Sequence, residues 1–277
     1  MVAQAVAEAI PELAFVLPRD IEEALVRAAE TETSPRASEV LRILCENARI
    51  AARDRVPICQ DTGSIWVCLE VGPDILVPGD VFADVNAAVA EGYIKHNLRK
   101  SIVRNALFDR ANTGDNTPAF TELRTVDAPG ARLQVMLKGG GSDNASRVVM
   151  LSPGAGAAGV RQVVLDAVRE KAANACPPLI IGVGVGSTFD KVAGLAKHAL
   201  LRPVGTPAKS AQHAAFEAEL LEAVNATGIG PGALGGKNTA LAVNLETAPC
   251  HIAALPVAVN LGCSAMRSAS VKLEVRP

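Results

Sequence analysis

The first 55 residues carry a pattern of apolar positions that predicts three helices. Apolar side chains recur every three or four residues over residues 3–15, 20–31 and 37–53. Pro18 and Asp20 stand between the first two segments, and proline followed by a capping residue is typical of a break between helices. Cys45 falls on the apolar stripe of the third segment, which indicates a small core side chain and not a metal ligand.

The rest of the chain mixes helical and strand patterns. Residues 64–72 alternate as a strand does, and Cys68 within them reads as structural. Residues 146–151 are predicted to pair with residues 131–137 across a glycine-rich turn. Without clean alternation of strand and helix, the fold class predicted is α+β: a helical part over residues 1–55 and mixed sheets packed with helices over residues 56–277, in one catalytic domain. Further helices are expected at 80–96, 157–173, 188–200 and 209–226, and further strands at 239–246, 255–261 and 270–275.

Composition narrows the class of protein. The chain has 277 residues, 49% of them apolar, so it can bury a large core. Its formal net charge is −2 and only 3% of its residues are aromatic, which argues against a nucleic-acid partner. An uncharged run at 247–266 is long enough for a membrane span, but Pro249, His251, Pro256 and Asn260 interrupt it, so no membrane is expected.

Cysteine usage and the N-terminus indicate a cytoplasmic protein. The six cysteines include no close pair, which suits a reducing compartment better than a disulfide framework. Glu8, Pro11 and Glu12 interrupt the apolar stretch that a signal peptide would need, so no signal peptide is expected.

Candidate chemistry gathers in the segment Pro57-Ile58-Cys59-Gln60-Asp61-Thr62-Gly63. A thiol, an amide, a carboxylate, a hydroxyl and a glycine follow one another directly before a strand. The segment is compatible with a plain turn in which Asp61 and Thr62 bond their own backbone. It is also compatible with a soft metal ligand placed beside a proton carrier.

Two further cysteines favour the interpretation of Cys59 as a metal ligand. Cys176 and Cys263 stand beside turn-forming residues inside uncharged runs, at 172–189 and 247–266. An apolar shell of this kind suits an iron–sulfur cluster, because it limits solvent access and sets the reduction potential. The wide spacing does not match a zinc site, which uses close pairs of ligands.

Two glycine-rich stretches resemble nucleotide-binding loops, but their spacing does not match the motifs, so nucleotide binding is rejected for both. Residues 179–186 have GxGxG spacing without an acidic residue about 20 positions later. Residues 235–239 resemble the end of a phosphate loop. However, Pro231 stands where the loop's first glycine is needed, and Asn238 stands where serine or threonine is needed. These glycines are expected to allow close packing. The polar loop 112–118 and the run Gly139-Gly140-Gly141 are each compatible with an ordinary turn or with ligand binding.

Taken together, five motifs resemble the α subunit of the two-subunit, iron–sulfur-dependent fumarate hydratases, whose relatives include the L-tartrate dehydratases. The resemblance runs from about residue 38 to residue 275. The motifs are Cys59–Gly63, Asn112–Pro118, Lys138–Asn144, Ala175–Pro178 and the end centred on Cys263.

The resemblance implies a 4Fe–4S cluster held by Cys59, Cys176 and Cys263, with one iron open to substrate. Cys250 is the rival third ligand, but the family pattern favours Cys263, which follows Pro-Val-Ala-Val-Asn and precedes Ala-x-Arg. Ser264 departs from the family, which has histidine or a bulkier residue at that position. The implied reaction is reversible hydration of fumarate to L-malate, a step of the tricarboxylic acid cycle.

Roles for further residues follow from the same resemblance. Asp61 and His251 are the implied acid–base pair, hydrogen-bonded to each other. Arg99 would clamp a substrate carboxylate, since a guanidinium matches one bidentately. Gln60 and the backbone N–H of Gly141 would contact substrate, with Lys138 structural.

The chain offers few cations for a dicarboxylate dianion. The family's remaining arginine, lysine and threonine ligands lie in a second region, so a β subunit is the expected partner, in an α2β2 heterotetramer with an open apolar surface around Cys59, Gly139–Gly141 and His251. Two alternatives stay open: an L-tartrate or mesaconate hydro-lyase, and a non-catalytic iron–sulfur module.

Overall fold

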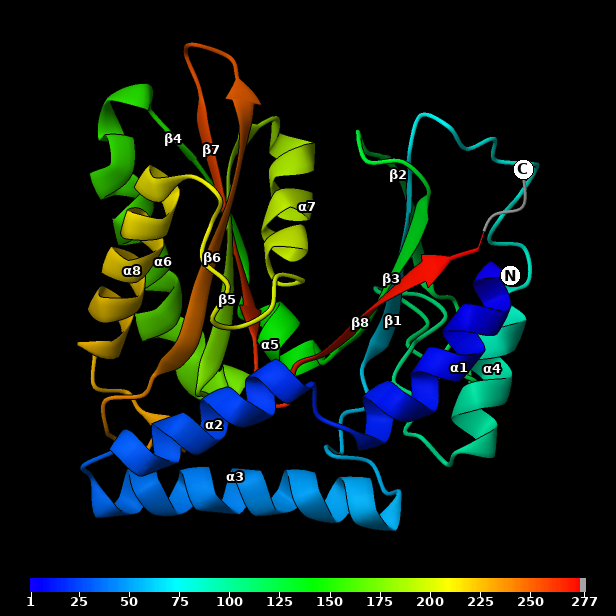
Figure 1. The fold of residues 1–277 in the computed structure, drawn as a ribbon, viewed down its shortest axis with the longest axis horizontal. Helices are drawn as coiled ribbons and strands as arrows, with labels where there is room; N and C mark the ends of the chain where they lie inside the picture. The colour runs from blue at the N-terminus through cyan, green and yellow to red at the C-terminus, as the bar shows by residue number, and fades with distance from the viewer. Residues whose placement is uncertain (275–277) are drawn as a thin grey trace. The chain divides into compact units, whose positions relative to one another are not determined.

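The computed structural model of the chain describes residues 1–274 and divides into two compact units. Unit 1 comprises Met1–Pro18, Ala48–Gly140 and the residues from Arg267 onward, and unit 2 comprises Arg19–Asn47 and Gly141–Met266. The helical segment 1–55 is therefore shared between the two units. Both contain helices and a mixed four-stranded sheet, so the α+β fold class is confirmed (Figure 1).

Unit 1 is built on a sheet with the strand order β2-β1-β3-β8. Strand β1 (Ser64–Val71) pairs with β2 (Phe120–Thr125) in parallel and with β3 (Ala131–Lys138) in antiparallel register, and β3 pairs antiparallel with β8 (Arg267–Leu273). Helices α1 (Val2–Phe15) and α4 (Val85–Lys95) share an apolar core with these strands. Burial of both faces explains why β1 is almost continuously apolar.

The strand β2 was missed by the sequence pattern. Its burial alternates only between exposed and half-buried, and it carries Glu122 and Arg124. It lies at the edge of the sheet, where charged side chains are common because they discourage pairing with other chains. The helix expected at 80–96 begins later, at Val85, because residues 81–84 form a turn.

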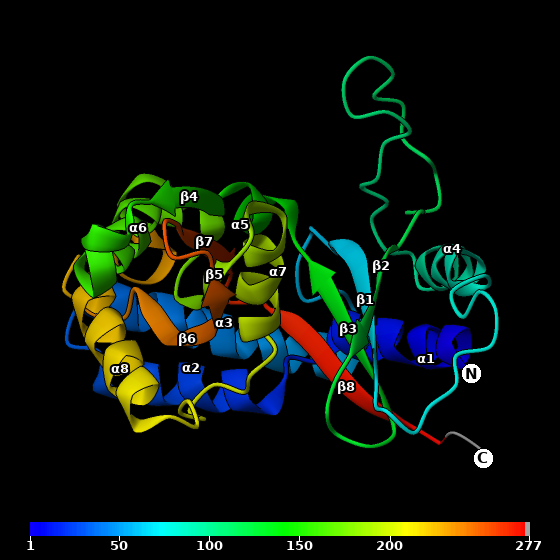
Figure 2. The same ribbon diagram turned by 90° about the horizontal axis from the view of Figure 1, so that it is seen from above.

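A long arm, residues 99–118, connects α4 to β2 and extends outward from unit 1 (Figure 2). Its two sides are joined by a backbone bond from Arg104 N to Ala111 O and by a bridge between Val103 and Asn112. Phe108 at its tip is 88% exposed. The arm is therefore an ordered hairpin that presents an apolar tip to solvent.

Unit 2 is built on a second sheet, with the order β4-β7-β5-β6. Helix α7 contacts this sheet on one face, while α6 and α8 cover the other (Figure 1). Strand β5 is parallel to β6 and antiparallel to β7, and β4 is antiparallel to β7. The elements are α2 (Arg19–Thr31), β4 (Arg147–Leu151), α6 (Gly156–Lys171), β5 (Leu179–Ser187), α7 (Phe189–Ala199), α8 (Ala211–Asn225), β6 (Ala240–Cys250) and β7 (Leu255–Gly262).

The predicted pairing of residues 146–151 with 131–137 was wrong. Strand β3 pairs with β1 and β8, whereas β4 pairs with β7 in the other sheet. Between them, the glycine-rich stretch opens the short helix α5 (Gly140–Asn144) and makes no hairpin turn. Both segments have apolar faces, so periodicity alone could not tell which strands they join. The last predicted strand, 270–275, corresponds to β8, and residue 275 lies outside the described residues.

The glycines of β5 serve packing, as expected. A Cβ atom on Gly182 would come within 2.1 Å of the Ala196 carbonyl oxygen, and one on Gly184 within 2.5 Å of the Val192 carbonyl oxygen. Helix α7 can thus approach the strand only because these residues lack side chains. This supports the rejection of a dinucleotide loop.

The stretch 235–239 is held by a carboxylate. Glu32, one residue beyond α2, accepts hydrogen bonds from the Lys237 N–H at 3.1 Å and from the Asn238 amide at 2.7 Å. Burial raises the pKa of Glu32, but bonds from Ser34, Asn238, Lys237 and Thr33 outweigh burial, so the pKa lies below its ordinary value. An acidic side chain at this place disfavours a phosphate ligand.

We expect Glu32→Gln to destabilise unit 2 by about 1 kcal/mol at pH 7, because hydrogen bonds to a charged acceptor are lost. The folded-state pKa of Glu32 is depressed, so its contribution is complete above the ordinary value of 4.5 and disappears as pH falls through the folded-state value. Urea unfolding at pH 7 and pH 3 measures this. Glu30→Gln, a change of an exposed glutamate in the last turn of α2, is the control. An equal effect of Glu32→Gln at both pH values would contradict the assignment.

Within residues 1–274, no helix combines the length and the apolar character needed to cross a membrane.

Candidate active site

The Cys59–Gly63 loop stands directly before β1 in unit 1 and is folded around the Asp61 carboxylate. Asp61 Oδ1 accepts a hydrogen bond from the Gly63 N–H at 3.0 Å, the Asx turn that the residue types allowed. Asp61 Oδ2 accepts from the Gly140 N–H at 2.8 Å. One carboxylate therefore joins two motifs that lie almost 80 positions apart in the sequence.

Gly139 and Gly140 lie against the Asp61 carboxylate, and Gly63 lies against the backbone of Lys138. Ideal Cβ atoms on Gly139 and Gly140 would lie 3.4 Å and 3.8 Å from Asp61 Oδ2, which is ordinary van der Waals contact, so space alone does not require glycine at either position. Gly63 has φ +81°, and a Cβ atom on it would meet Lys138 N at 2.9 Å. Glycine is required at Gly63 by both conformation and space.

The Cys59 thiol is half-buried and close to the same loop. The Asp61 N–H donates to Cys59 Sγ at 3.4 Å, and the Cys59 thiol donates to the side-chain oxygen of exposed Gln60 at 3.3 Å. A backbone N–H directed at a thiolate sulfur is one of the features that tune cluster potentials. The loop thus presents a thiol and a fixed carboxylate within three residues.

Arg99 begins the arm, and its backbone is attached to the same loop. The buried Thr62 hydroxyl donates to the Arg99 carbonyl oxygen at 2.8 Å. The Arg99 side chain is exposed, as a group that captures a ligand from solvent must be. Lys138 is 3% exposed, which agrees with a structural role.

In unit 2, the structure brings Cys176 and Cys263 together. Cys176 precedes β5 and Cys263 follows β7, and these strands are antiparallel, so the two residues share one end of the sheet. The Ser264 N–H donates to the Cys176 carbonyl oxygen at 3.1 Å. Gly141 lies near the same segment, because a Cβ atom on it would be 3.2 Å from the Asn174 carbonyl oxygen.

Cys250 and His251 are found at the opposite end of that sheet. Cys250 is in register with Ser187 at the end of β5, whereas Cys176 precedes its start. Strand β7, which has eight residues, lies between His251 and Cys263. At about 3.3 Å per residue, a strand of this length spans about 25 Å. The topology of unit 2 therefore favours Cys263 over Cys250 as the partner of Cys176, and it does not place His251 beside that pair.

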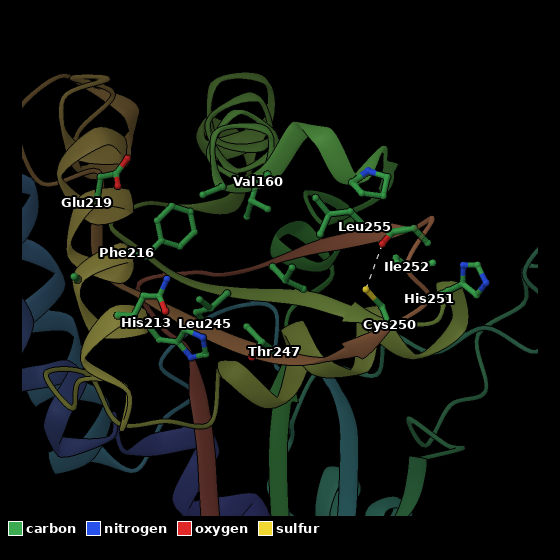
Figure 3. A pocket seen from close by; sticks show the side chains of 17 residues that line it. Val160, His213, Phe216, Glu219, Leu245, Thr247, Cys250, His251, Ile252 and Leu255 are labelled. Atoms are coloured by element: carbon green, nitrogen blue, oxygen red, sulfur yellow. Dashed lines mark hydrogen bonds between the residues drawn. The ribbon is translucent and has the colours of Figure 1, made fainter.

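His251 belongs instead to the rim of a separate cavity of about 680 Å³ in unit 2 (Figure 3). Val160, Phe216, Leu245 and Leu255 make its lining largely apolar. His251 is exposed on the turn between β6 and β7, and its Nδ1 accepts a bond from the Ala253 N–H at 3.1 Å.

The other two cysteines, Cys45 and Cys68, are buried, as expected for core side chains. Cys45 is 5% exposed and Cys68 is fully buried. Burial raises the pKa of the Cys68 thiol to about 12, with help from the charges of Glu122 and Glu70. A thiol with such a pKa stays protonated at neutral pH when no metal is bound.

Comparison with known proteins decides the family. The model of the fumarate hydratase (fumerase) family matches residues 3–272. The chain belongs to the fumarate hydratase family. This match covers nearly the whole chain and extends the resemblance, seen from about residue 38, into the N-terminal helices.

The relatives of this fumarate hydratase family member carry another substrate in their names. A protein of Methanocaldococcus jannaschii, provisionally named as L(+)-tartrate dehydratase subunit alpha, is 34% identical over 282 residues, covering 99% of this chain and 98% of its own. The L(+)-tartrate dehydratase subunit alpha of Escherichia coli (strain UTI89 / UPEC) is 33% identical over 261 residues, covering 93% and 86%. That of Escherichia coli O157:H7 is 34% identical over 255 residues, covering 91% and 84%.

The site residues that sequence reasoning missed are those that hold the loop from inside. They are Tyr93, Asn116 and Arg267, all buried and all bonded to carbonyls of the Cys59–Gly63 loop. Asn116 is part of the polar loop 112–118, whereas nothing in the segment around Tyr93 marks it for this role. The signals available were Asn116 in the Asn112–Pro118 motif and Arg267 in the Ala-x-Arg end of the motif centred on Cys263.

Proposed function

We propose that the chain is the α subunit of a hydro-lyase that adds water reversibly to fumarate and gives L-malate. The observation that carries the proposal is the Asp61 carboxylate, fixed by Gly63 and Gly140 beside the Cys59 thiol. A hydro-lyase must move a carbon-bound proton, and a carboxylate held in one orientation suits that task.

A 4Fe–4S cluster is the proposed cofactor, held by Cys59, Cys176 and Cys263, with one iron left without a protein ligand. The donor set fits: Cys176 and Cys263 share one end of a sheet, and Cys59 accepts an N–H bond suited to a thiolate. When bound, a cluster with an open iron supplies Lewis-acid assistance to departure of the substrate hydroxyl.

The chain's own residues would do the remaining work. Arg99 would bind one substrate carboxylate from the base of the arm, in the bidentate geometry that guanidinium groups favour. Gln60 and the Gly141 N–H would orient the substrate. Asp61 would take the proton from the carbon beside the hydroxyl-bearing carbon during dehydration and return it during hydration.

The proposed role of His251 as second acid–base group depends on where it lies relative to the cluster cysteines. Within unit 2 it lies at the far end of the sheet from Cys176 and Cys263. A role as the second acid–base group therefore requires a site to which another chain contributes.

The second candidate substrate is L(+)-tartrate, and the names of the relatives favour it. Tartrate has one more hydroxyl group than malate. The Cys59–Gly63 loop offers the same groups to both substrates, so the substrates must be compared directly.

A β subunit is the proposed partner, because the relatives are named as alpha subunits. The α2β2 arrangement proposed for the assembly is the one that the resemblance to the two-subunit fumarate hydratases implies. Arg99 is the one cation proposed here for a dianionic substrate, so other cations would come from the partner. The arm offers a second chain apolar surface, with Leu107 72% and Phe108 88% exposed.

We expect turnover only from the co-expressed α and β chains, prepared without oxygen and assayed with L-malate, L(+)-tartrate and mesaconate. The substrate with the highest kcat/KM identifies the reaction. The reconstituted α chain alone is the control, with turnover expected to be at least about a hundredfold lower, the scale of losing substrate-positioning contacts. Equal rates for the α chain alone would contradict the requirement for a partner, and an assembled enzyme inactive on all three would contradict the hydro-lyase.

A further inference from the structure

The Cys59–Gly63 loop is held by three buried side chains that bond three consecutive carbonyl oxygens. Arg267 Nη2 donates to the Asp61 carbonyl at 2.9 Å. The Tyr93 hydroxyl is 2.9 Å from the Thr62 carbonyl and 3.0 Å from the Gly63 carbonyl. Asn116 Nδ2 donates to the Gly63 carbonyl at 3.1 Å.

These three groups come from separate parts of unit 1. Tyr93 belongs to α4, Asn116 to the arm, and Arg267 to the first position of β8, opposite Leu137 in β3. Asn116 also accepts a bond from the Ser101 N–H at 2.8 Å, which ties the two sides of the arm together at its base. The inner side of the loop is therefore fixed at every carbonyl from Asp61 to Gly63.

Arg267 differs from the other two because it carries a charge and is incompletely bonded. It is 1% exposed, and its Nε and Nη1 atoms are buried without a hydrogen-bond partner among the described residues. A buried cation with unused donors is costly, and a neutral apolar side chain would fill the same space more stably. Packing alone therefore does not explain an arginine here.

The Arg267 charge lies near other ionisable groups of the site. The same loop presents the Asp61 carboxylate and the Cys59 thiol. The influence of Arg267 reaches Tyr93 as well: burial raises the pKa of that hydroxyl, while the Arg267 charge opposes the rise and Asp61 adds to it. Arg267 and Asp61 therefore both lie close enough to Tyr93 to act on it, with opposite charges.

We propose that Arg267 is the positioning residue of the site: its buried guanidinium fixes the Asp61 backbone and balances the charge of the loop, so that the Asp61 carboxylate keeps the orientation set by Gly63 and Gly140. The kinetic part of this inference rests on the proposed function. The structural part does not, since it concerns the loop in the α chain itself.

The structural test is amide hydrogen exchange on the full α chain without cluster. Arg267→Met removes charge and donors at similar length, and Arg267→Lys keeps the charge and one donor nitrogen. In Arg267→Met, the Asp61, Gly63 and Gly140 amides should exchange about 10- to 100-fold faster, the range for losing a hydrogen bond to a charged group. Arg267→Lys should recover most of that protection.

Two further variants make the result specific. Arg132→Met removes an exposed arginine of the same sheet, whose Nη1 bonds Ser270 Oγ at 3.1 Å, and should leave the three amides unchanged. Tyr93→Phe removes one hydroxyl while its ring stays in the core, and should speed exchange at Gly63 more than at Gly140. If Arg267→Met fails to fold, Tyr93→Phe still tests whether the side chains that bond the loop carbonyls protect the loop from exchange.

The kinetic test uses the assembled α/β enzyme with its best dicarboxylate substrate. Arg267→Met should lower kcat about tenfold or more with KM changed less than twofold, because proton transfer depends on orientation. Arg267→Lys should restore most of kcat. Unchanged exchange at the three amides, or equal effects of lysine and methionine, would overturn the assignment. Absence of turnover in the wild type would refute the proposed function while the exchange result still decides the role of Arg267.

Discussion

Cys176→Ser and Cys263→Ser are expected to abolish both the cluster and turnover, and Cys59→Ser to do the same. Serine is a far weaker ligand for iron than a thiolate, since its hydroxyl stays protonated. Activity should fall by more than about a hundredfold, the scale reached when even outer partners of a metal site are lost. Iron and sulfide content, the visible absorption spectrum and turnover of the anaerobic enzyme measure the effect.

Cys250→Ser is the matched control for these variants. It removes an exposed cysteine from the same unit, but from the opposite end of the sheet. Cluster content should stay at the wild-type level, as it should in Cys45→Ser and Cys68→Ser. Loss of the cluster in Cys250→Ser together with its retention in Cys263→Ser would reverse the proposed ligand assignment.

Asp61→Asn is expected to lower kcat by about 10²–10⁴-fold while the cluster remains, because a positioned proton carrier contributes on that scale. The substitution keeps the size of the side chain and removes its charge. Asn can accept only one of the two bonds that Gly63 and Gly140 donate, so some loosening of the loop is expected as well. Steady-state kinetics together with cluster spectra separate the two effects.

The control for Asp61→Asn is Asp74→Asn. Asp74 also lies in unit 1 and accepts a bond from a glycine N–H, that of Gly130 at 2.8 Å. Its substitution should leave kcat within about twofold, as surface changes away from a site usually do. A wild-type kcat in Asp61→Asn would remove Asp61 from the mechanism.

The sequence pattern could predict elements whose burial is regular. The three N-terminal helices and α6, α7 and α8 match apolar spacing, because one face of each helix packs on a core. The partners of β3 and β4 could not be predicted, since both strands would suit several neighbours. The edge strand β2 was missed because it has hardly any buried face.

The chemically reactive residues of the candidate site were easier to predict than the residues that hold them in place. Cys59 and Asp61 are chemically conspicuous neighbours in the sequence, and the Asx turn at Asp61 follows from residue type. The bonds from Gly140, Tyr93 and Arg267 depend on how distant segments meet. The distance between His251 and Cys263 likewise depends on strand direction, which the eleven intervening residues do not reveal.

The most direct test of the central proposal is electron paramagnetic resonance of the reduced, anaerobically prepared α/β enzyme, with and without a dicarboxylate substrate. A cluster with an open iron should give a signal that changes when L-malate or L(+)-tartrate binds, and iron loss should abolish turnover in parallel with the signal. Full turnover in a metal-free preparation, or a cluster signal that no dicarboxylate alters in an active enzyme, would contradict it.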